Sequence, residues 1–289
     1  MTPEQEFSAI IQVPGSPVTV EGVLFVPPNV SQVRAVITII DWSLGPTVYA
    51  DAAWRTLSEQ LQSCLLLVAV RDEDAMTLDT PVDQVPVRNA AIGGADGLFI
   101  LLEDLAKQSG HAELANAKLL LWGQSAAGSF VVTFAALYPG RTIGFVRYHS
   151  HSRELPVDIE TTAQIPGLLL AGETDETAGV EDTLALWRRG RVLGAPWTFG
   201  IEPGASHRSL EHLAHANRVA IPWVSAVFQL RMQGDVTLSP IAEHAGWLAN
   251  LQSGAINSCA SFSGVRQEAS WLPDEATALG WQAVTSLAQ

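Results

Sequence analysis

One segment constrains this 289-residue chain more than any other, because it joins a short apolar run to a helix through a turn of small residues. Residues 119–122 are apolar, residues 123–128 read GQSAAG, and residues 130–138 have a helical pattern. In a strand–turn–helix junction of this kind the turn is sharp, so the flanking residues must be small and the serine hydroxyl projects past the carboxyl end of the strand. Ser125 is therefore a candidate nucleophile.

The turn departs from the GxSxG pattern at its fifth position, which is Ala127, and a glycine follows one place later as Gly128. Small residues around a serine also occur by chance in an alanine-rich chain. The alternative interpretation of Ser125 is a helix-capping residue in an ordinary strand-to-helix loop. Other parts of the chain have to decide between the two interpretations.

Two further apolar runs end just before an acidic residue and a histidine, both of which can take part in proton transfer. Residues 166–171 are predicted to be a buried strand that exits into a turn containing Asp175. Residues 197–201 are predicted to be another strand, and the turn after it contains His207. Serine, acid and histidine therefore follow one another along the chain, each just past the carboxyl end of its own predicted strand.

In this order of residues the chain resembles the α/β-hydrolase family over about residues 7 to 231. In that family the nucleophile, acid and histidine meet because loops at one edge of a parallel sheet converge. The resemblance implies that Ser125 is the nucleophile, His207 the general base and Asp175 the acid that orients the histidine. It also implies an α/β fold with a mostly parallel central sheet, helices on both faces and an antiparallel N-terminal strand pair, as in esterases and dienelactone hydrolases without a large cap.

The acid and the histidine both have competitors. Glu173 and Glu176 lie near the same strand exit as Asp175, and Glu173 is the alternative acid. A carboxylate bonded to one ring nitrogen leaves the other nitrogen free to take the serine proton. The remaining histidines are expected to be structural or exposed, but two that follow the predicted strand 142–148 would face the same crevice and could contact substrate. The histidines weighed against His207 are His111, His149, His151, His212, His215 and His244.

Acyl transfer also needs donors for the oxygen on which negative charge develops. We expect one donor to be the backbone N–H of Ala126 and the other to come from the loop after the predicted strand 35–40. Trp42 is the first choice for that second donor and Ser43 the alternative. The family often has His-Gly in this loop, and this chain does not. A carboxylate on Asp41 would oppose catalysis unless it is paired or points away.

Substrate contacts are expected from side chains in the loops that border the crevice. The short interval 148–166, where related hydrolases commonly carry a lid, predicts no large cap and an open site. Trp42 and Trp54 are further candidates for lining the substrate pocket. The residues expected to bind substrate are Ser43, Tyr49, Gln124 and His149.

Strand and helix patterns alternate along the chain, which predicts helices on both faces of the sheet. Residues 1–232 are predicted to form the hydrolase domain, and residues 233–289 an extension packed on it by Trp247, Trp271 and Trp281. The interval 71–88, with two prolines, is predicted to be a loop. Besides the elements named above, the predicted strands are 8–13, 18–25, 35–40 and 65–70, and the predicted helices are 52–61, 90–107, 183–192 and 209–232.

Composition excludes several classes of function. The 16 basic and 30 acidic residues give a net charge of −14, which disfavours a nucleic-acid partner. No segment approaches the roughly 18 apolar residues of a membrane span, and the polar start of the chain is unlike a signal peptide. We leave the compartment open between cytoplasmic and secreted or periplasmic. Cys64 and Cys259 are expected to be free thiols.

The sequence therefore predicts a serine hydrolase that cleaves a small carboxylic ester and needs no metal or organic cofactor. The same residues would also serve an amidase or peptidase, or a thioesterase. Outside enzymology, a non-catalytic binding protein of the same fold is the alternative. Ala127, Asp41 and the absent His-Gly favour it.

Overall fold

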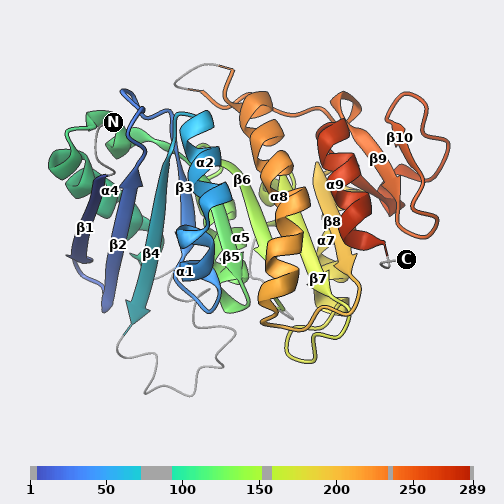
Figure 1. Ribbon diagram of the computed structural model, residues 1–289, viewed down its shortest axis with the longest axis horizontal. Coiled ribbons are helices and arrows are strands. Elements are labelled where there is room, and N and C mark those ends of the chain that lie inside the picture. The colour runs from blue at the N-terminus through green and yellow to red at the C-terminus, as the bar shows by residue number, and fades with distance from the viewer. Residues whose placement is uncertain (1–4, 73–92, 152–157, 234–236, 287–289) are drawn as a thin grey trace.

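The computed structural model describes residues 5–72, 93–151, 158–233 and 237–286. Its main strands are β1 (Gln5–Gln12), β2 (Val18–Val26), β3 (Ala35–Ile40), β4 (Cys64–Asp72), β5 (Lys118–Gln124), β6 (Thr142–Tyr148), β7 (Gly167–Gly172) and β8 (Trp197–Glu202). These strands form one eight-stranded sheet in the order β1-β2-β4-β3-β5-β6-β7-β8 (Figure 1).

The sheet is antiparallel at its N-terminal edge and parallel elsewhere. β2 pairs antiparallel with both β1 and β4, while β4, β3, β5, β6, β7 and β8 run parallel. Central strands such as β3 and β7 are buried along their whole length, as expected for strands covered on both faces. The predicted antiparallel opening pair and mostly parallel sheet are confirmed.

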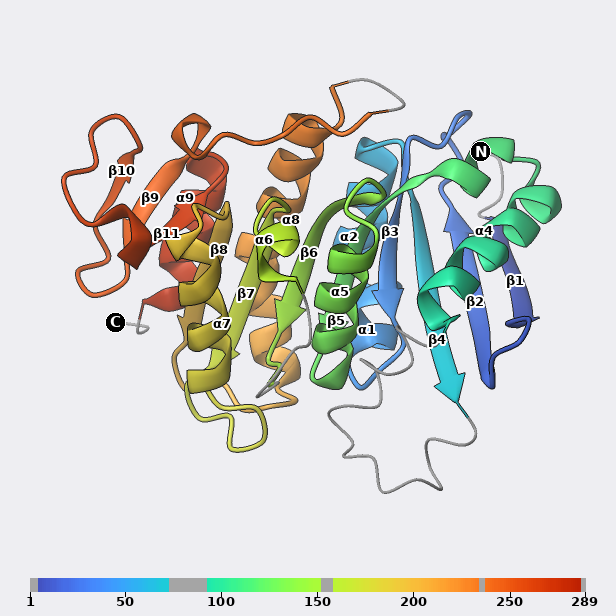
Figure 2. The same ribbon diagram turned by 180° about the vertical axis from the view of Figure 1, so that it is seen from behind.

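Helices cover both faces of the sheet, as predicted. Figure 1 shows one face with α1 (Gly45–Ala50), α2 (Ala52–Gln60), α8 (Leu210–Arg231) and α9 (Glu275–Thr285). Figure 2 shows the opposite face with α4 (Ala95–Ser109), α5 (Ala126–Leu137), α6 (Ile159–Thr162) and α7 (Glu181–Val192). Short 3-10 turns are η2 (Ala112–Asn116), η3 (Glu243–Ala245) and η4 (Arg266–Glu268).

Two predicted boundaries differ from the structure, one at the start of α4 and one at the end of β4. The helix expected from residue 90 begins at Ala95, and its predicted buried stripe is present on the side that faces the sheet. Arg71 and Asp72, placed in a loop by the sequence, are the last two residues of β4. The rest of the predicted loop, and the start of the predicted helix, lie outside the described residues. The stripe consists of Leu98, Leu101, Leu102 and Leu105.

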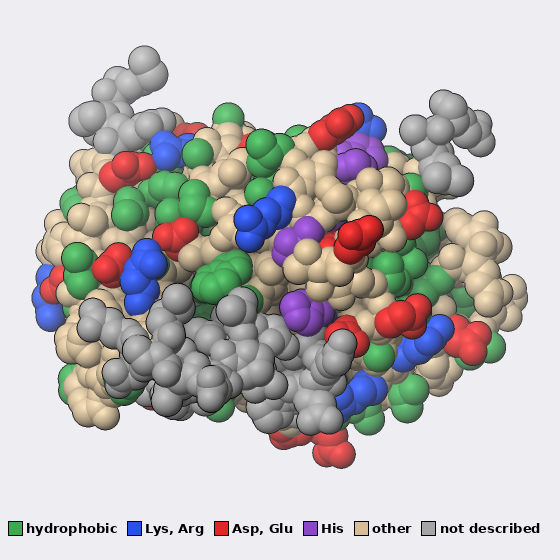
Figure 3. All heavy atoms as spheres, turned by 90° about the horizontal axis from the view of Figure 1, so that it is seen from below, with side chains coloured by type: hydrophobic (Ala, Val, Ile, Leu, Met, Phe, Trp, Pro, Cys, Tyr) green, Lys and Arg blue, Asp and Glu red, His purple; other side chains and the backbone are tan. Residues whose placement is uncertain are grey.

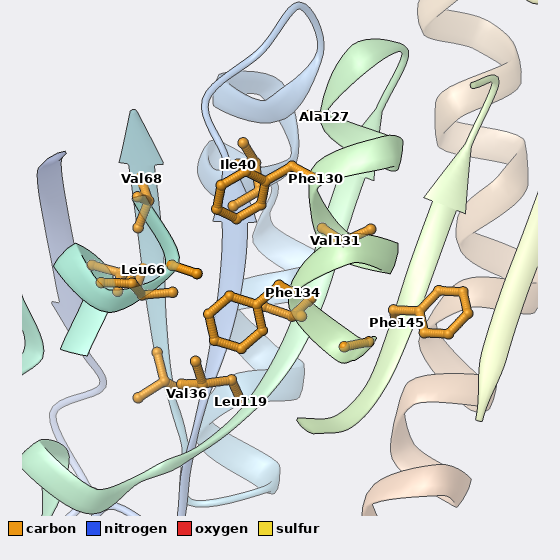
Figure 4. Close-up of a cluster of buried hydrophobic side chains, with 14 of the residues drawn as sticks. Val36, Ile40, Leu66, Val68, Leu119, Ala127, Phe130, Val131, Phe134 and Phe145 are labelled. Atoms are coloured by element: carbon orange, nitrogen blue, oxygen red, sulfur yellow. The ribbon is translucent and has the colours of Figure 1, made fainter. Parts of the chain in front are cut away.

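Helix α5 is the central helix of its face and is buried almost all round. Phe130, Val131 and Phe134 pack against apolar side chains of β3, β4 and β5 (Figure 4). A helix that is apolar on every side belongs inside a protein rather than on its surface. The packing fixes the first turn of α5 against the end of β5, and this turn carries Ser125.

The C-terminal segment adds a small antiparallel sheet that the sequence did not predict. β9 (Trp247–Asn250), β10 (Ile256–Ser258) and β11 (Ala269–Leu272) have the order β10-β9-β11. This segment contacts β8 through hydrogen bonds. Trp281 donates from Nε1 to the carbonyl of Phe199 (2.7 Å), and Ser270 Oγ accepts from the Phe199 N–H (2.7 Å).

Because β3 to β8 run parallel, their carboxyl ends meet along one edge of the sheet, which in an open α/β sheet is where ligands bind. Figure 3 looks onto that edge, and histidine side chains gather near the middle of it. No helix within the described residues is both long and apolar enough to cross a membrane.

Candidate active site

Ser125 lies in a strained turn between β5 and α5, with φ 57° and ψ −129°. The turn closes on itself so tightly that a Cβ at Gly123 would lie 2.3 Å from the carbonyl oxygen of Ala127. A Cβ at Gly128 would lie 2.5 Å from that of Ser150. Glycine is thus required at both places, whereas the methyl group of Ala127 fits in the apolar core. The departure from GxSxG is therefore sterically harmless.

The structure joins the three residues expected to act together into one hydrogen-bonded chain. His207 Nε2 lies 2.9 Å from Ser125 Oγ, and His207 Nδ1 lies 2.8 Å from Asp175 Oδ2. Since a carboxylate can only accept, Nδ1–H donates to Asp175, and Nε2 is left to accept the hydrogen of the Ser125 hydroxyl. This is the arrangement in which an imidazole can take a proton from a serine.

Asp175 is held rigidly behind His207. Its second carboxylate oxygen, Oδ1, accepts backbone N–H bonds from Thr177 (2.9 Å) and Ala178 (2.8 Å), and the residue is buried. Glu173, the alternative acid, is exposed, and its carboxylate accepts instead from the N–H of Gly204 (2.9 Å). Geometry thus favours Asp175 as the partner of His207.

Left-handed backbone conformations gather at this edge of the sheet. Among the described residues, four that are not glycine have positive φ, and three of these follow β3, β5 and β6: Ser43 (53°), Ser125 (57°) and His149 (42°). The fourth is Gln62 (51°), in the turn after α2. Strained residues cluster where a protein must place groups for binding or catalysis.

The donors for a developing oxyanion differ in part from the sequence-based choice. The Trp42 N–H donates to the carbonyl of Ile40 (2.8 Å), so it is already engaged within the loop. The N–H of Ser43 and that of Ala126, the first residue of α5, take part in no hydrogen bond within the described residues. The N–H groups in the first turn of a helix have no acceptor within the helix. Ser43, the alternative, therefore replaces Trp42 as the candidate second donor.

Comparison with known proteins gives a fold and no closer relationship. No protein-family model matches the sequence, and no curated protein matches it significantly. Solved structures do match. An acylaminoacyl peptidase of Pyrococcus horikoshii aligns with a TM-score of 0.57 at 11% identity, over 80% of this chain and 43% of that chain. A thermostable carboxyl esterase of Bacillus coagulans aligns with a TM-score of 0.52 at 10% identity, over 77% of this chain and 99% of that one.

A third neighbour is Est1E from Butyrivibrio proteoclasticus, with a TM-score of 0.51 and 13% identity over 77% of this chain and 99% of that chain. This chain has the α/β-hydrolase fold. At such low identities the likeness establishes the architecture, and the chemistry has to be argued from the residues of the site.

In this α/β-hydrolase fold, Asp41 is turned toward a cation. Its Oδ2 lies 4.0 Å from the guanidinium of Arg71 on β4, and its N–H donates to the carbonyl of Val68 (2.6 Å). The positive charge of Arg71 thus partly offsets the negative charge of Asp41, which follows the same strand as the candidate donor Ser43.

Two of the expected substrate-binding side chains have structural partners instead. Gln124 is fully buried, and its Nε2 donates to the carbonyl of His207 (2.9 Å), so it anchors the histidine loop. The Tyr49 hydroxyl bonds Glu6 of β1 (3.2 Å), and its ring packs under Arg55. These contacts assign both side chains a structural role, and a substrate contact for either remains a prediction.

Trp54 and His149 also have structural partners, whereas Ser43 remains exposed. Trp54 is buried and donates from Nε1 to Asn217 of α8 (2.9 Å), so it belongs to the packing between helices. His149 is 1% exposed and bonds Glu202 (2.8 Å), so it lies beneath the surface rather than in the crevice. Ser43 stays in place as an exposed residue of the loop after β3.

A wide, open hollow of about 420 Å³ lies beside His207. It is lined by Thr174, Glu176, Thr177, Ser206, His207 and Arg208. A larger cavity, of about 660 Å³, lies at the opposite edge of the sheet near Lys118 and Arg141, where no part of the hydrogen-bonded chain reaches. Proximity to His207, rather than volume, therefore identifies the candidate substrate site.

Sequence reasoning missed Glu202, the last residue of β8. It is fully buried beside His149, and a charged residue at the end of an apolar strand was the available signal.

Proposed function

We propose that this protein is a serine hydrolase that cleaves carboxylic esters through an acyl-enzyme. The observation that carries the proposal is the hydrogen-bonded chain from Ser125 through His207 to Asp175, with its serine in a strained turn at the start of a buried helix. A helix-capping serine needs neither a histidine nor a carboxylate, and the Ser125 side chain makes no cap hydrogen bond to α5.

In the first half of the reaction, Ser125 Oγ attacks the carbonyl carbon of the ester while His207 Nε2 takes the hydroxyl proton. Asp175 stabilises the imidazolium that forms. The tetrahedral intermediate then expels the alcohol, which leaves with the proton from His207. The acyl group remains on Ser125 as an ester.

Charge on the carbonyl oxygen would be met by the N–H groups of Ala126 and Ser43. Two backbone donors held in place before the reaction need no rearrangement as charge develops, which is the source of their catalytic value. Ala126 directly follows Ser125 at the start of α5, and Ser43 lies in the loop after β3, the strand that pairs with β5.

In the second half, His207 takes a proton from water, and the resulting hydroxide attacks the acyl carbon. The acid is released and Ser125 regains its proton from His207. The balance is one ester and one water consumed, with one acid and one alcohol formed.

An ester is preferred over an amide because an alcohol leaves with less help from a proton donor than an amine does. Two structural neighbours are described as a carboxyl esterase and Est1E, and one as an acylaminoacyl peptidase. Amide and thioester cleavage are therefore tested beside ester cleavage.

The experiment measures release of product from an ester, an amide and a thioester that share one short acyl group, with wild-type protein and Ser125→Ala. We expect the ester to turn over fastest and Ser125→Ala to lose turnover while keeping the wild-type circular dichroism spectrum. Equal turnover by the two proteins would exclude the mechanism. A folded wild-type chain that cleaves none of the three substrates would favour the non-catalytic alternative.

A further inference from the structure

A second histidine–carboxylate pair lies directly behind Asp175. His149 Nε2 is 2.8 Å from Glu202 Oε2, and His149 Nδ1 is 3.9 Å from Asp175 Oδ2. The side chains of all three residues are 0% exposed. A second hydrogen-bonded pair, His149 and Glu202, is therefore buried next to Asp175, at a distance from Asp175 that allows an ion pair but no hydrogen bond.

The sheet itself builds this arrangement. His149 follows β6 with φ 42°, its N–H donates to the carbonyl of Leu170 (2.8 Å), and its carbonyl accepts from the N–H of Ser125 (3.2 Å). Gly172, at the end of β7, leaves space for the ring, since a Cβ there would lie 2.9 Å from His149 Cε1. The backbone therefore places the imidazole against the end of β7, within hydrogen-bond distance of Glu202 at the end of β8.

The charges at this place need a cation. Asp175 and Glu202 are two buried carboxylates, and neither forms an ion pair with a lysine or arginine among the described residues. Two buried negative charges with no cation beside them would repel one another. Tyr148 packs against the ring of His149. Burial, and then the charge of Glu202, raises the pKa of the Tyr148 phenol, so the phenol stays neutral.

His149 is the group that can supply the positive charge. Its Nε2 bonds Glu202 at 2.8 Å, and its Nδ1 lies 3.9 Å from the Asp175 carboxylate, within ion-pair distance but too far for a hydrogen bond. An imidazole protonated on both nitrogens would place a positive charge beside both carboxylates. The remaining titratable neighbour, His207, already directs its N–H at Asp175. The Tyr148 ring stacks on the His149 ring with centroids 4.0 Å apart, which also favours a cation there.

We propose that His149 is a positioning residue that holds the Asp175 carboxylate in its charged state and in place for His207, while Glu202 holds His149. This inference rests on the proposed hydrolase function only for its effect on rate. Its effect on the stability of the charge cluster does not depend on catalysis.

The test compares His149→Gln with the double variant His149→Gln/Glu202→Gln. The single change removes the cation and leaves two buried carboxylates whose charges repel each other, which disturbs the position of Asp175 behind His207. We expect kcat to fall about 10- to 100-fold with little change in KM, the range seen when an outer partner of a metal-binding histidine is lost. The acid limb of the pH profile of kcat/KM should move to higher pH.

The double variant removes the surplus carboxylate as well, and a glutamine pair can bond where the histidine–glutamate pair did. It should therefore be more active than His149→Gln, have a higher Tm, and return the acid limb toward its wild-type position. A merely structural role for His149 predicts the reverse order, with the double variant worse than the single one. That order, or an unmoved acid limb, would overturn the proposal.

His111→Gln is the matched control, because His111 and Glu113 form a similar pair (3.0 Å) at the amino end of β5. It should leave the acid limb where it is. If the wild-type chain cleaves no ester, the proposed function fails but the Tm comparison still tests the charge cluster. If His149→Gln does not fold, recovery of folding in the double variant supports the proposal, and continued failure overturns it.

Discussion

His207 Nε2 lies 2.9 Å from Ser125 Oγ, although 82 positions of the chain separate the two residues. The contact exists because β5 and β8 run parallel in one sheet, so that the turns after both strands open at the same edge. Asp175 completes the chain from the turn after β7, one of the two strands that lie between them. Local sequence can place each residue after a strand, and the sheet topology then brings them together.

Asp175→Asn should lower kcat for ester hydrolysis by about 10,000-fold, since an amide at this position favours the wrong tautomer of His207. Glu173→Gln is the matched control and should leave kcat unchanged, because the Glu173 carboxylate accepts a hydrogen bond from the backbone of Gly204 and none from His207 within the described part of the chain. The measurement is steady-state kinetics with one ester. Equal losses in the two variants would remove Asp175 from its assigned role.

The oxyanion assignment predicts that the backbone of Ser43, and not its side chain, is needed. Ser43→Gly should keep kcat, since glycine adopts a φ of 53° without strain. Ser43→Val should lower kcat about 100- to 1,000-fold, the cost of losing one donor, because a β-branched residue resists positive φ. Gln62→Val imposes the same strain away from the site, at φ 51°, and should leave kcat unchanged. Unchanged kcat in Ser43→Val would contradict the assignment.

The turn around Ser125 should tolerate glycine at position 127 but no side chain at position 123. Ala127→Gly should keep activity and lower the free energy of unfolding by about 1 kcal/mol, the cost of glycine in a helix. Gly123→Ala should abolish activity, since its Cβ would lie 2.3 Å from a backbone oxygen. Gly140→Ala is the control, because a Cβ there meets nothing within 4 Å. Kinetics and urea unfolding check all three, and an active Gly123→Ala would contradict the turn geometry.

The buried thiol of Cys64 should make the folded protein less stable at alkaline pH. Burial, and then the charge of Glu113, raises the pKa of its thiol in the folded state. Above the unfolded pKa of about 8.5 the unfolded thiol loses its proton while the folded one keeps it, so the free energy of unfolding falls by about 1.4 kcal/mol per pH unit. Urea unfolding between pH 8.5 and 10 should show this slope reduced in Cys64→Ala. Identical slopes would contradict the burial of an un-ionised thiol.

The fold was predictable because the apolar runs are strong signals. Continuous apolar runs such as those of β3 and β7 are typical of strands buried on both faces, and the leucine stripe of α4 has helical spacing. Ser125, Asp175 and His207 each follow such a run. The small sheet of β9, β10 and β11 was missed because its strands are only three or four residues long.

The finer details of the site depend on backbone angles and side-chain directions that no local pattern specifies. The choice between Trp42 and Ser43 turns on one hydrogen bond, from the Trp42 N–H to Ile40. Whether Gln124 and His149 face the crevice or the interior depends on partners far away in sequence, His207 and Glu202. A glycine-rich turn therefore predicts the position of a site, whereas the directions of the side chains around it depend on contacts between segments that are distant in sequence.

Reaction with a fluorophosphonate probe, followed by mass spectrometric mapping of the modified peptide, tests the central claim most directly, since only an activated serine reacts. We predict a single adduct on Ser125 in the folded wild-type protein, none in Ser125→Ala or in heat-unfolded protein, and much slower labelling in His207→Ala. A folded wild-type protein that stays unlabelled, or that carries its adduct on another residue, would contradict the account.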